Sequence, residues 1–428
     1  MREMKDSGIE WIGEIPKDWS LKKGRYLFVQ RNDRGNDENL QLLSPSQKFG
    51  VIPQSLLEDL TTQTTVKLKE NTDLSTLKTV HKGDFCISLR SFQGGFEYSE
   101  YEGVVSPAYQ IFYKKEDLVN TYYKYIFKDS SFISKMNSYT MSLRDGKNIS
   151  YFDFGNTYLP LPTVCEQQQI ADYLDTQCSE IDATAEDIQK EISLLEEYKK
   201  SVITEAVTKG LNPDAEMKDS GIKWIGKIPI NWQAVNPRWL FAQRKDRAKK
   251  GMEQYTASQK YGVISQKDYM NRIGGSIVTV QKDFDILKMV CEGDFVIHMR
   301  SFQGGLEYSE HTGSISSAYV MLIPKKNTGE CRYFKWLFKS ASYINALQST
   351  SNLIRDGQAM RYSNFIQIII PYPPLDEQQQ IADFLDTKCS EIDAIIADKK
   401  RQLDILAEYK KSLIYEYVTG KKEVPINE

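Results

Sequence analysis

Two copies of the sequence Arg-Ser-Phe-Gln-Gly carry side chains that are well suited to contact nucleic acid. A guanidinium presents two parallel donors to guanine or phosphate, and a glutamine amide can pair with adenine in the same way. The structural alternative is that each arginine pairs with Glu97 or Glu307, a few residues further on, and staples a hairpin. The candidate DNA contacts in these two stretches are Arg90, Ser91, Gln93, Arg300, Ser301 and Gln303.

Three other pairs of motifs have residue types that favour contact with phosphate or bases. A Gln-Lys step beside a glycine turn suits entry into a groove, and arginines in loops or turns suit phosphate. The alternatives are a solvated charged loop, or an arginine paired with a neighbouring aspartate. These candidates are Gln47, Lys48, Gln259 and Lys260 in the Gln-Lys steps, Arg31, Arg34, Arg244 and Arg247 in the charged loops, and Arg144 and Arg355 before Asp-Gly.

The sequence offers no convincing catalytic or metal-binding pattern. The three histidines, His81, His298 and His311, do not recur as pairs, and no C-x-x-C occurs among the six cysteines. A phosphate-binding loop of the type G-x-x-x-x-G-K-[ST] is also missing. We therefore expect no catalytic residue, no metal site and no directly bound cofactor. A nuclease or methyltransferase acting in its own right is the disfavoured alternative.

The candidate motifs recur because the chain consists of two copies of one sequence unit. The segment 83–100 returns as 293–310 with 14 of 18 residues identical, and 166–183 returns as 377–394 with 16 of 18 identical. Residues that are identical in both copies are expected to be scaffold or phosphate contacts, whereas residues that differ on the same surface are better candidates for reading bases. The first part of each copy mixes period-two runs with turn signals, which predicts a mixed α/β globular domain. In this pattern Phe85 and Ile87 alternate with Cys86 and read as a half-buried strand.

The second part of each copy predicts a long helix with a heptad seam. Thr163 and Glu166 have the spacing of a capping box at the start of the first helix. The alternative is an ordinary amphipathic helix on a globular core. The seam residues are Leu174, Ile181, Ile188, Leu195 and Val202 in the first copy, and Leu385, Ile392, Leu406 and Leu413 in the second.

The two helices are expected to pair with each other in antiparallel orientation. A parallel pair would need a linker as long as the helix, whereas only a short segment separates Gly210 from Met217. The predicted fold class is α+β, with two homologous mixed α/β domains separated by an antiparallel coiled coil and related by approximate two-fold symmetry. The predicted segments are domain 1 at 1–162, helix 1 at 163–210, domain 2 at 211–373, helix 2 at 374–422 and a tail at 423–428.

Charge is distributed unevenly along the chain. The net charge of −3 hides a basic second domain, because residues 211–372 hold 22 basic and 14 acidic residues while 166–210 hold 4 and 11. A local positive field of this kind attracts DNA whatever the average charge is. The charged N-terminus and the lack of a long apolar run favour a cytoplasmic protein that does not enter a membrane.

Two ordered motifs, each present twice, resemble those of a known family. The segment Ser7–Pro16 (SGIEWIGEIP) returns at Ser220–Pro229, and proline-rich segments ending at Pro162 and Pro374 lead into Glu-Gln-Gln-Gln-Ile-Ala at Glu166 and Glu377. In this order the chain resembles, over essentially its whole length, the specificity subunits of type I restriction–modification systems.

The resemblance implies a DNA-reading function without chemistry of its own. Each globular domain would read one half of a split site in double-stranded DNA, and the helices would set the spacing and dock two methyltransferase subunits. Restriction/translocase subunits would join for cleavage, and S-adenosylmethionine, ATP and Mg²⁺ would bind to these partners. The alternatives are a specificity subunit of a methylation-only complex and a coiled-coil structural protein without DNA specificity.

Overall fold

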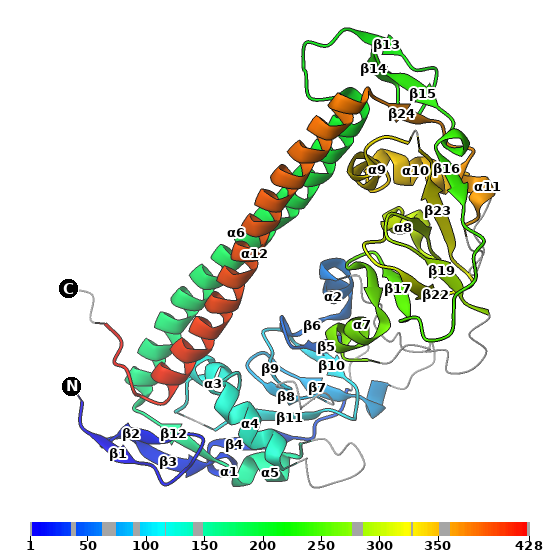
Figure 1. Ribbon diagram of the computed structural model, residues 1–428. Helices are drawn as coiled ribbons and strands as arrows, with labels where there is room; N and C mark the ends of the chain where they lie inside the picture. Colours follow the sequence, from blue (N-terminus) through cyan, green and yellow to red (C-terminus); the bar gives the residue numbers. More distant parts are fainter. Residues whose placement is uncertain are drawn as a thin grey trace. The chain divides into compact units, whose positions relative to one another are not determined.

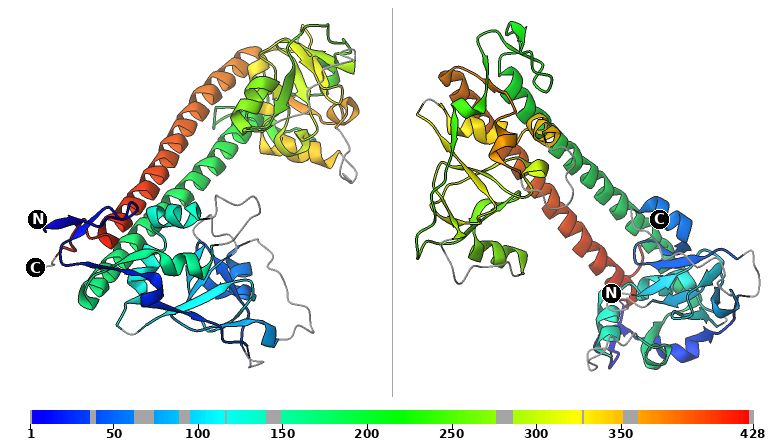
Figure 2. Two further views of the ribbon diagram at one scale, coloured as in Figure 1. Left: turned by 90° about the horizontal axis from the view of Figure 1, so that it is seen from below. Right: turned by 90° about the vertical axis from the view of Figure 1, so that its right-hand side faces the viewer.

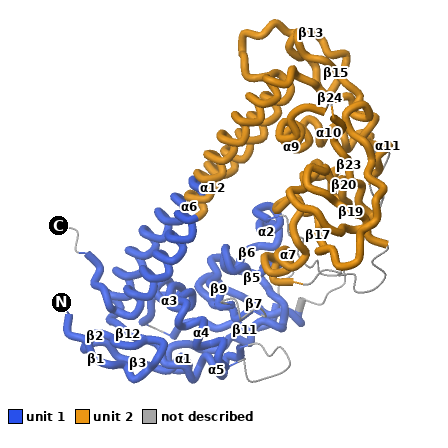
Figure 3. Tube along the Cα trace, in the orientation of Figure 1, with its two compact units in different colours: residues 1–188, 401–428 blue, residues 189–400 orange. Residues whose placement is uncertain are grey.

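A computed structural model describes residues 2–35, 40–61, 74–88, 95–115, 117–139, 149–275, 286–326, 328–350 and 360–425. The chain forms two compact units, one of residues 1–188 with 401–428 and the other of residues 189–400 (Figure 3). Each unit holds one globular domain and one part of each long helix.

The globular domain of the first unit is built on an antiparallel four-stranded sheet of order β4-β11-β8-β9 (Figure 1). Two-stranded pairs β1-β2, β3-β12, β5-β6 and β7-β10 surround this sheet. The strands are β1 (Met4–Asp6), β2 (Glu14–Pro16), β3 (Ser20–Lys23), β4 (Phe28–Arg31), β5 (Leu43–Ser46), β6 (Gly50–Pro53), β7 (Lys78–Val80), β8 (Phe85–Ile87), β9 (Phe96–Tyr98), β10 (Gly103–Val105), β11 (Gln110–Lys114) and β12 (Tyr158–Leu161). The helices are α1 (Gly24–Leu27), α2 (Gln54–Leu60), η1 (Leu74–Thr76), α3 (Asn120–Ile126), α4 (Ser130–Ser138) and α5 (Tyr151–Asn156).

The domain of the second unit repeats this plan, with a four-stranded sheet of order β16-β23-β20-β21. Its strands are β13 (Met217–Asp219), β14 (Lys227–Pro229), β15 (Gln233–Val235), β16 (Phe241–Gln243), β17 (Tyr255–Ser258), β18 (Gly262–Ser265), β19 (Lys288–Val290), β20 (Phe295–Ile297), β21 (Glu307–Tyr308), β22 (Gly313–Ile315), β23 (Val320–Pro324) and β24 (Ile370–Tyr372). Its helices are η3 (Pro237–Trp239), α7 (Gln266–Ile273), α8 (Ser301–Gly304), α9 (Cys331–Leu337), α10 (Ala341–Ser349) and α11 (Tyr362–Phe365). The predicted pair of homologous mixed α/β domains is confirmed.

Strand β8 shows why the pattern alone underestimated burial. Phe85 and Ile87 pack into the aromatic core on one face of the sheet, where the rings of Phe85 and Phe112 stack at 5.3 Å. Cys86 on the other face is also fully buried, in a smaller apolar cluster with Leu43 and Val51. The expectation of a half-buried strand was wrong because the β5–β6 hairpin covers the second face.

The long helices are α6 (Val164–Lys209) and α12 (Leu375–Val418), and they pack side by side (Figures 1 and 2). In the first unit, the rings of Tyr173 and Tyr417 pack at a tilt with 4.6 Å between their centroids, and Asp182 pairs with Lys410 at 2.6 Å. As residue numbers increase along α6, the numbers of their partners on α12 therefore decrease, which is the pattern of antiparallel helices. In the second unit Glu191 pairs with Lys399 and Lys199 with Asp393 in the same sense. The predicted antiparallel pairing is confirmed within each unit.

The predicted seam residues are buried or half-buried along both helices. The lysines that interrupt its apolar tracks are Lys199, Lys399 and Lys410, and each of them reaches an acidic residue on the other helix. Exposed pairs of this kind contribute little to stability, but polar seam residues specify register and orientation. The buried seam residues are Leu174, Ile188, Leu385, Ile392 and Leu413, and the half-buried ones are Ile181, Leu195, Val202 and Leu406.

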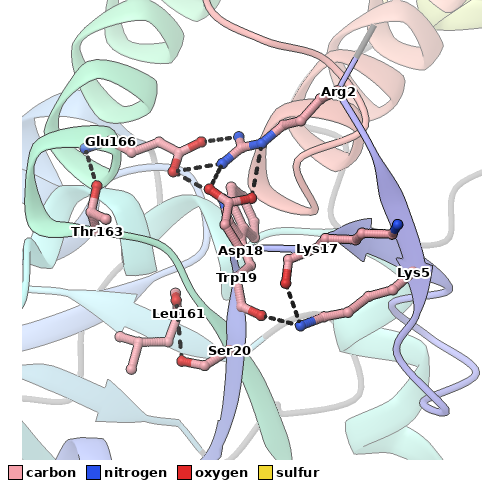
Figure 4. Close-up of polar contacts among 9 residues, drawn as sticks. All are labelled: Arg2, Lys5, Lys17, Asp18, Trp19, Ser20, Leu161, Thr163 and Glu166. Carbon is pink, nitrogen blue, oxygen red and sulfur yellow. Dashed lines mark hydrogen bonds and ion pairs between the residues drawn. The ribbon is translucent and has the colours of Figure 1, made fainter.

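The start of α6 is anchored to the N-terminal strands (Figure 4). The backbone N–H of Glu166 donates to Thr163 Oγ1 at 3.3 Å, which is one half of the predicted capping box. The Glu166 carboxylate does not return to the cap: it accepts from Trp19 Nε1 at 2.9 Å and pairs with Arg2. Arg2 also pairs with Asp18, so the helix start and the entry strands are held together.

Among the described helices, none combines the length and the apolar character that a membrane span requires.

Candidate nucleic-acid interface

Two turns that are distant in sequence meet in the second unit. The β17–β18 turn holds Gln259 and Lys260, and the α8 turn runs from Arg300 to Gly305. Gln259 Nε2 donates to the carbonyl oxygen of Arg300 at 3.0 Å, which fixes one turn against the other. Four predicted DNA contacts lie exposed on these two turns: Gln259, Lys260, Arg300 and Gln303.

The two glycines at the end of the α8 turn permit this close approach. A Cβ atom on Gly304 would lie 2.7 Å from Cγ of Gln259, which leaves no room for a side chain. Gly305 has a φ of +76°, and its Cβ would lie 1.9 Å from the carbonyl oxygen of Phe338. Gly304-Gly305 is therefore a packing requirement of the turn in the second unit.

Arg300 does not form the hairpin staple that was the alternative to DNA contact. Glu307 is 2% exposed and pairs with Lys339 instead. Among the described residues, no hydrogen bond or ion pair engages the Arg300 guanidinium, so its donors are available to a ligand.

Ser301 has a structural role, and its assignment as a DNA contact is corrected. The residue is fully buried, and its hydroxyl oxygen accepts from the backbone N–H of His298 at 2.8 Å. This hydrogen bond closes the start of the α8 turn, so the hydroxyl is not presented to DNA.

Arg31 and Arg244 each have a buried acidic partner, and contact of either residue with phosphate stays a prediction. Nε of Arg31 donates to Asp84 at 2.7 Å, and Nε of Arg244 donates to Asp294 at 2.7 Å. Both aspartates are buried, and the arginine side chains are only 16% and 14% exposed. Each guanidinium compensates a buried carboxylate, which favours a structural role over contact with phosphate.

The other described candidates remain exposed. Arg34 donates to the carbonyl oxygen of Thr76 at 2.8 Å and Arg247 to that of Ile286 at 3.1 Å, so backbone contacts orient both. Gln47 and Lys48 lie on the β5–β6 turn of the first unit, which corresponds to the β17–β18 turn. Phosphate or base contact by these residues stays a prediction. The candidates that lie outside the described residues are Arg90, Ser91, Gln93, Arg144 and Arg355.

Lys128 and Lys339 lie beside these turns and were missed by the motif analysis. Lys128 donates to Glu97 at 2.6 Å and to the carbonyl oxygen of Gln47 at 3.2 Å, and Lys339 makes the matching contact to Glu307. The signal that could have revealed them was Glu97 itself, a charged residue retained at the same place in both copies. Among the described residues, no three metal-type ligands cluster.

The burial of Glu97 predicts a pH-dependent stability. Burial raises the pKa of this carboxyl from 4.5 to about 7, and Lys128 offsets the rise only partly. Between these values the folded chain keeps a proton that the unfolded chain releases, so the wild type loses up to about 3 kcal/mol as pH rises through this window.

Glu97→Gln removes this titration. The difference in melting temperature, variant minus wild type, should therefore increase as the pH is raised from about 5 to about 7.5. Melting curves recorded across this range test the prediction, and two pH profiles that run parallel would contradict it.

The chain belongs to the family described as the type I restriction modification DNA specificity domain, whose model matches residues 15–194 and 229–404. It is 24% identical to a putative type I restriction enzyme MjaX specificity subunit of Methanocaldococcus jannaschii, over 96% of each chain. It is 25% identical to the MjaVIII specificity subunit of the same organism, over 67% of this chain and 68% of that one.

Solved structures support the same fold. One chain, from work on complex assembly and conformational transition of the type I R-M system, matches with a TM-score of 0.69 and 13% identity, over 95% of this chain and 99% of that one. The HsdS subunit from Thermoanaerobacter tengcongensis matches with a TM-score of 0.52 and 13% identity, over 95% and 98%. Family and fold together define a type I specificity subunit.

Proposed function

We propose that the chain is the non-catalytic DNA-reading subunit of a type I complex, in which each globular domain reads one half of a split site. The observation that carries the proposal is the repeated hairpin turn. Gln47 and Lys48 in one unit, and Gln259 and Lys260 in the other, are exposed at the same place on equivalent domains. Amide and ammonium donors at a turn suit base edges and phosphate.

The helix that follows each hairpin carries different charges in the two units, which supports the proposal that the two half-sites differ in sequence. In the second unit α7 carries Lys267 and Arg272, whose guanidinium lies 5.1 Å from the ring of Tyr261 on the turn. In the first unit α2 carries Glu58 and Asp59 instead. Surfaces that are equivalent in position but different in charge favour different base sequences.

The two long helices are the elements that could set the spacing between half-sites. Each unit contains an antiparallel stretch of the seam, and lysine–acid pairs fix the register there. We propose that this seam sets the number of base pairs between the two half-sites.

An exposed apolar pair on each helix supports the docking of two identical partners. Leu194 and Tyr198 on α6 are 63% and 51% exposed, and Ile405 and Tyr409 at the equivalent positions of α12 are 61% and 52% exposed. Exposed aliphatic and aromatic residues one turn apart are typical of helix contacts with a protein partner. We propose that each pair contacts one methyltransferase subunit.

Serine substitutions test this docking. Replacing Leu194 and Tyr198 together should weaken the binding of one methyltransferase about a hundredfold and leave the other bound. Native mass spectrometry of the reconstituted complex measures the stoichiometry. The matched variant replaces Ile405 and Tyr409. It should weaken the binding of the other methyltransferase by the same factor. The retention of two methyltransferases by both variants would contradict the proposed surfaces.

The chemistry of the complex is assigned to its partners. S-adenosylmethionine would bind the methyltransferases, and ATP and Mg²⁺ would bind restriction/translocase subunits where the complex contains them. A methylation-only complex needs the same DNA-reading chain. We place the complex in the cytoplasm, with its DNA substrate.

Genome-wide mapping of DNA methylation tests the function. Cells that produce the chain with its methyltransferase should carry one split methylated motif, and deletion of the chain should remove it. An unchanged methylation pattern, with the methyltransferase present, would contradict the proposal.

A further inference from the structure

A buried carboxylate lies directly beneath the α8 turn. Glu307 on β21 is 2% exposed, and its Oε1 atom accepts from Lys339 Nζ at 2.5 Å. The same ammonium donates to the carbonyl oxygen of Gly304 at 3.0 Å. Lys339 therefore connects the C-terminal end of the α8 turn to a buried negative charge.

A buried histidine lies between the other end of the turn and the same carboxylate. His298 is 5% exposed, and its Nδ1 atom accepts from the backbone N–H of Arg300 at 3.4 Å. Its Nε2 atom lies 3.5 Å from Oε1 of Glu307 and is a buried atom without a hydrogen-bond partner among the described residues. Glu307 is therefore bonded through Lys339 to one end of the turn that carries Arg300 and Gln303, and it lies beside the histidine that contacts the other end.

Base recognition by these side chains requires the turn to be placed accurately. A bidentate contact tolerates only small displacements, so the groups that lock the turn matter as much as the groups that touch the base. We propose that Glu307 is a positioning residue for DNA recognition, which holds the α8 turn through Lys339, with His298 packed beside it, so that Arg300 and Gln303 meet the bases of one half-site. This inference rests on the proposed function.

The first domain provides a matched comparison. Glu97 is also 2% exposed, and its partner Lys128 holds the carbonyl oxygen of Gln47 on the β5–β6 turn. Ser88 stands where the second domain has His298. Each domain therefore has its own buried glutamate and lysine, and each pair should act only on its own half-site.

The test is methylation mapping with the full chain, produced with its methyltransferase in a host that lacks other DNA methylation. Glu307→Gln keeps the size of the side chain and removes the charge. It should lower discrimination about tenfold at one or more base pairs of one half-site and leave the other half-site unchanged. Lys339→Met should do the same, and Lys339→Arg should restore part of the discrimination. Glu97→Gln should change the opposite half-site.

The outcomes separate a positioning role from a purely structural one. Methylation that falls evenly at all sites, with both half-sites intact, would overturn the inference. If Glu307→Gln fails to fold, Lys339→Met and His298→Ser decide, and an unchanged motif with both would also overturn it. A wild-type chain that produces no split motif contradicts the proposed function itself. A split motif that these variants leave intact contradicts only the role of Glu307.

Discussion

Arg300→Ala should cost about 1–3 kcal/mol of binding at one half-site and leave the other unchanged. The guanidinium is exposed and has no partner among the described residues. It lies on a turn that Lys339 holds through the carbonyl oxygen of Gly304. Its removal therefore affects recognition without exposing a buried charge. Binding of the reconstituted complex to DNA with each half-site altered in turn measures the effect.

A matched arginine separates recognition from general charge. Arg238 lies on η3 of the same unit and stacks on Trp239 at 4.9 Å, and Arg238→Ala should leave both half-sites intact. An equal loss by Arg300→Ala on specific and random DNA would reduce Arg300 to a phosphate contact.

Lengthening both helices by one heptad should increase the preferred spacing between half-sites by about three base pairs. Seven helical residues add about 10 Å, and successive base pairs lie about 3.4 Å apart. Duplicating residues 185–191 of α6 and 394–400 of α12 adds the heptads at the same level, because Glu191 pairs with Lys399 there. The half-site sequences should not change. Methylation mapping of the variant gives both results.

A duplication in α6 alone serves as the control, because it leaves the helices unequal in length. This variant should lose defined spacing altogether. A doubly lengthened chain that keeps the original spacing would contradict the proposal that the helices measure it.

The repeat made most of the fold predictable. Periodic apolar residues such as Leu174 and Leu385 identified the helices, and the short linker before Met217 gave their orientation. The lysines in the seam looked like interruptions, because their acidic partners, such as Asp393 for Lys199, lie on the other helix. Burial of Cys86 was missed for the same reason: the hairpin that covers it comes from another part of the chain.

The interface was predictable only in part. Exposed motifs such as that of Arg300 could be recognised because they recur. Recurrence does not, however, distinguish residues exposed on the surface from residues with a structural role. Arg244 and Ser301 recur equally well and are occupied by Asp294 and by the backbone of His298. These partners are tertiary neighbours, and local sequence alone does not assign them.

Replacing the second domain with a copy of the first tests most directly whether one domain reads one half-site. Residues 4–160 would take the place of 217–371, and the contacts with the helices should survive: Tyr122 donates to the carbonyl oxygen of Val418 as Tyr333 does to that of Val207. Methylation mapping should then show a motif that contains the first domain's half-site twice and has lost the other. A motif that stays unchanged, or that changes in both halves, would contradict the assignment of one half-site to each domain.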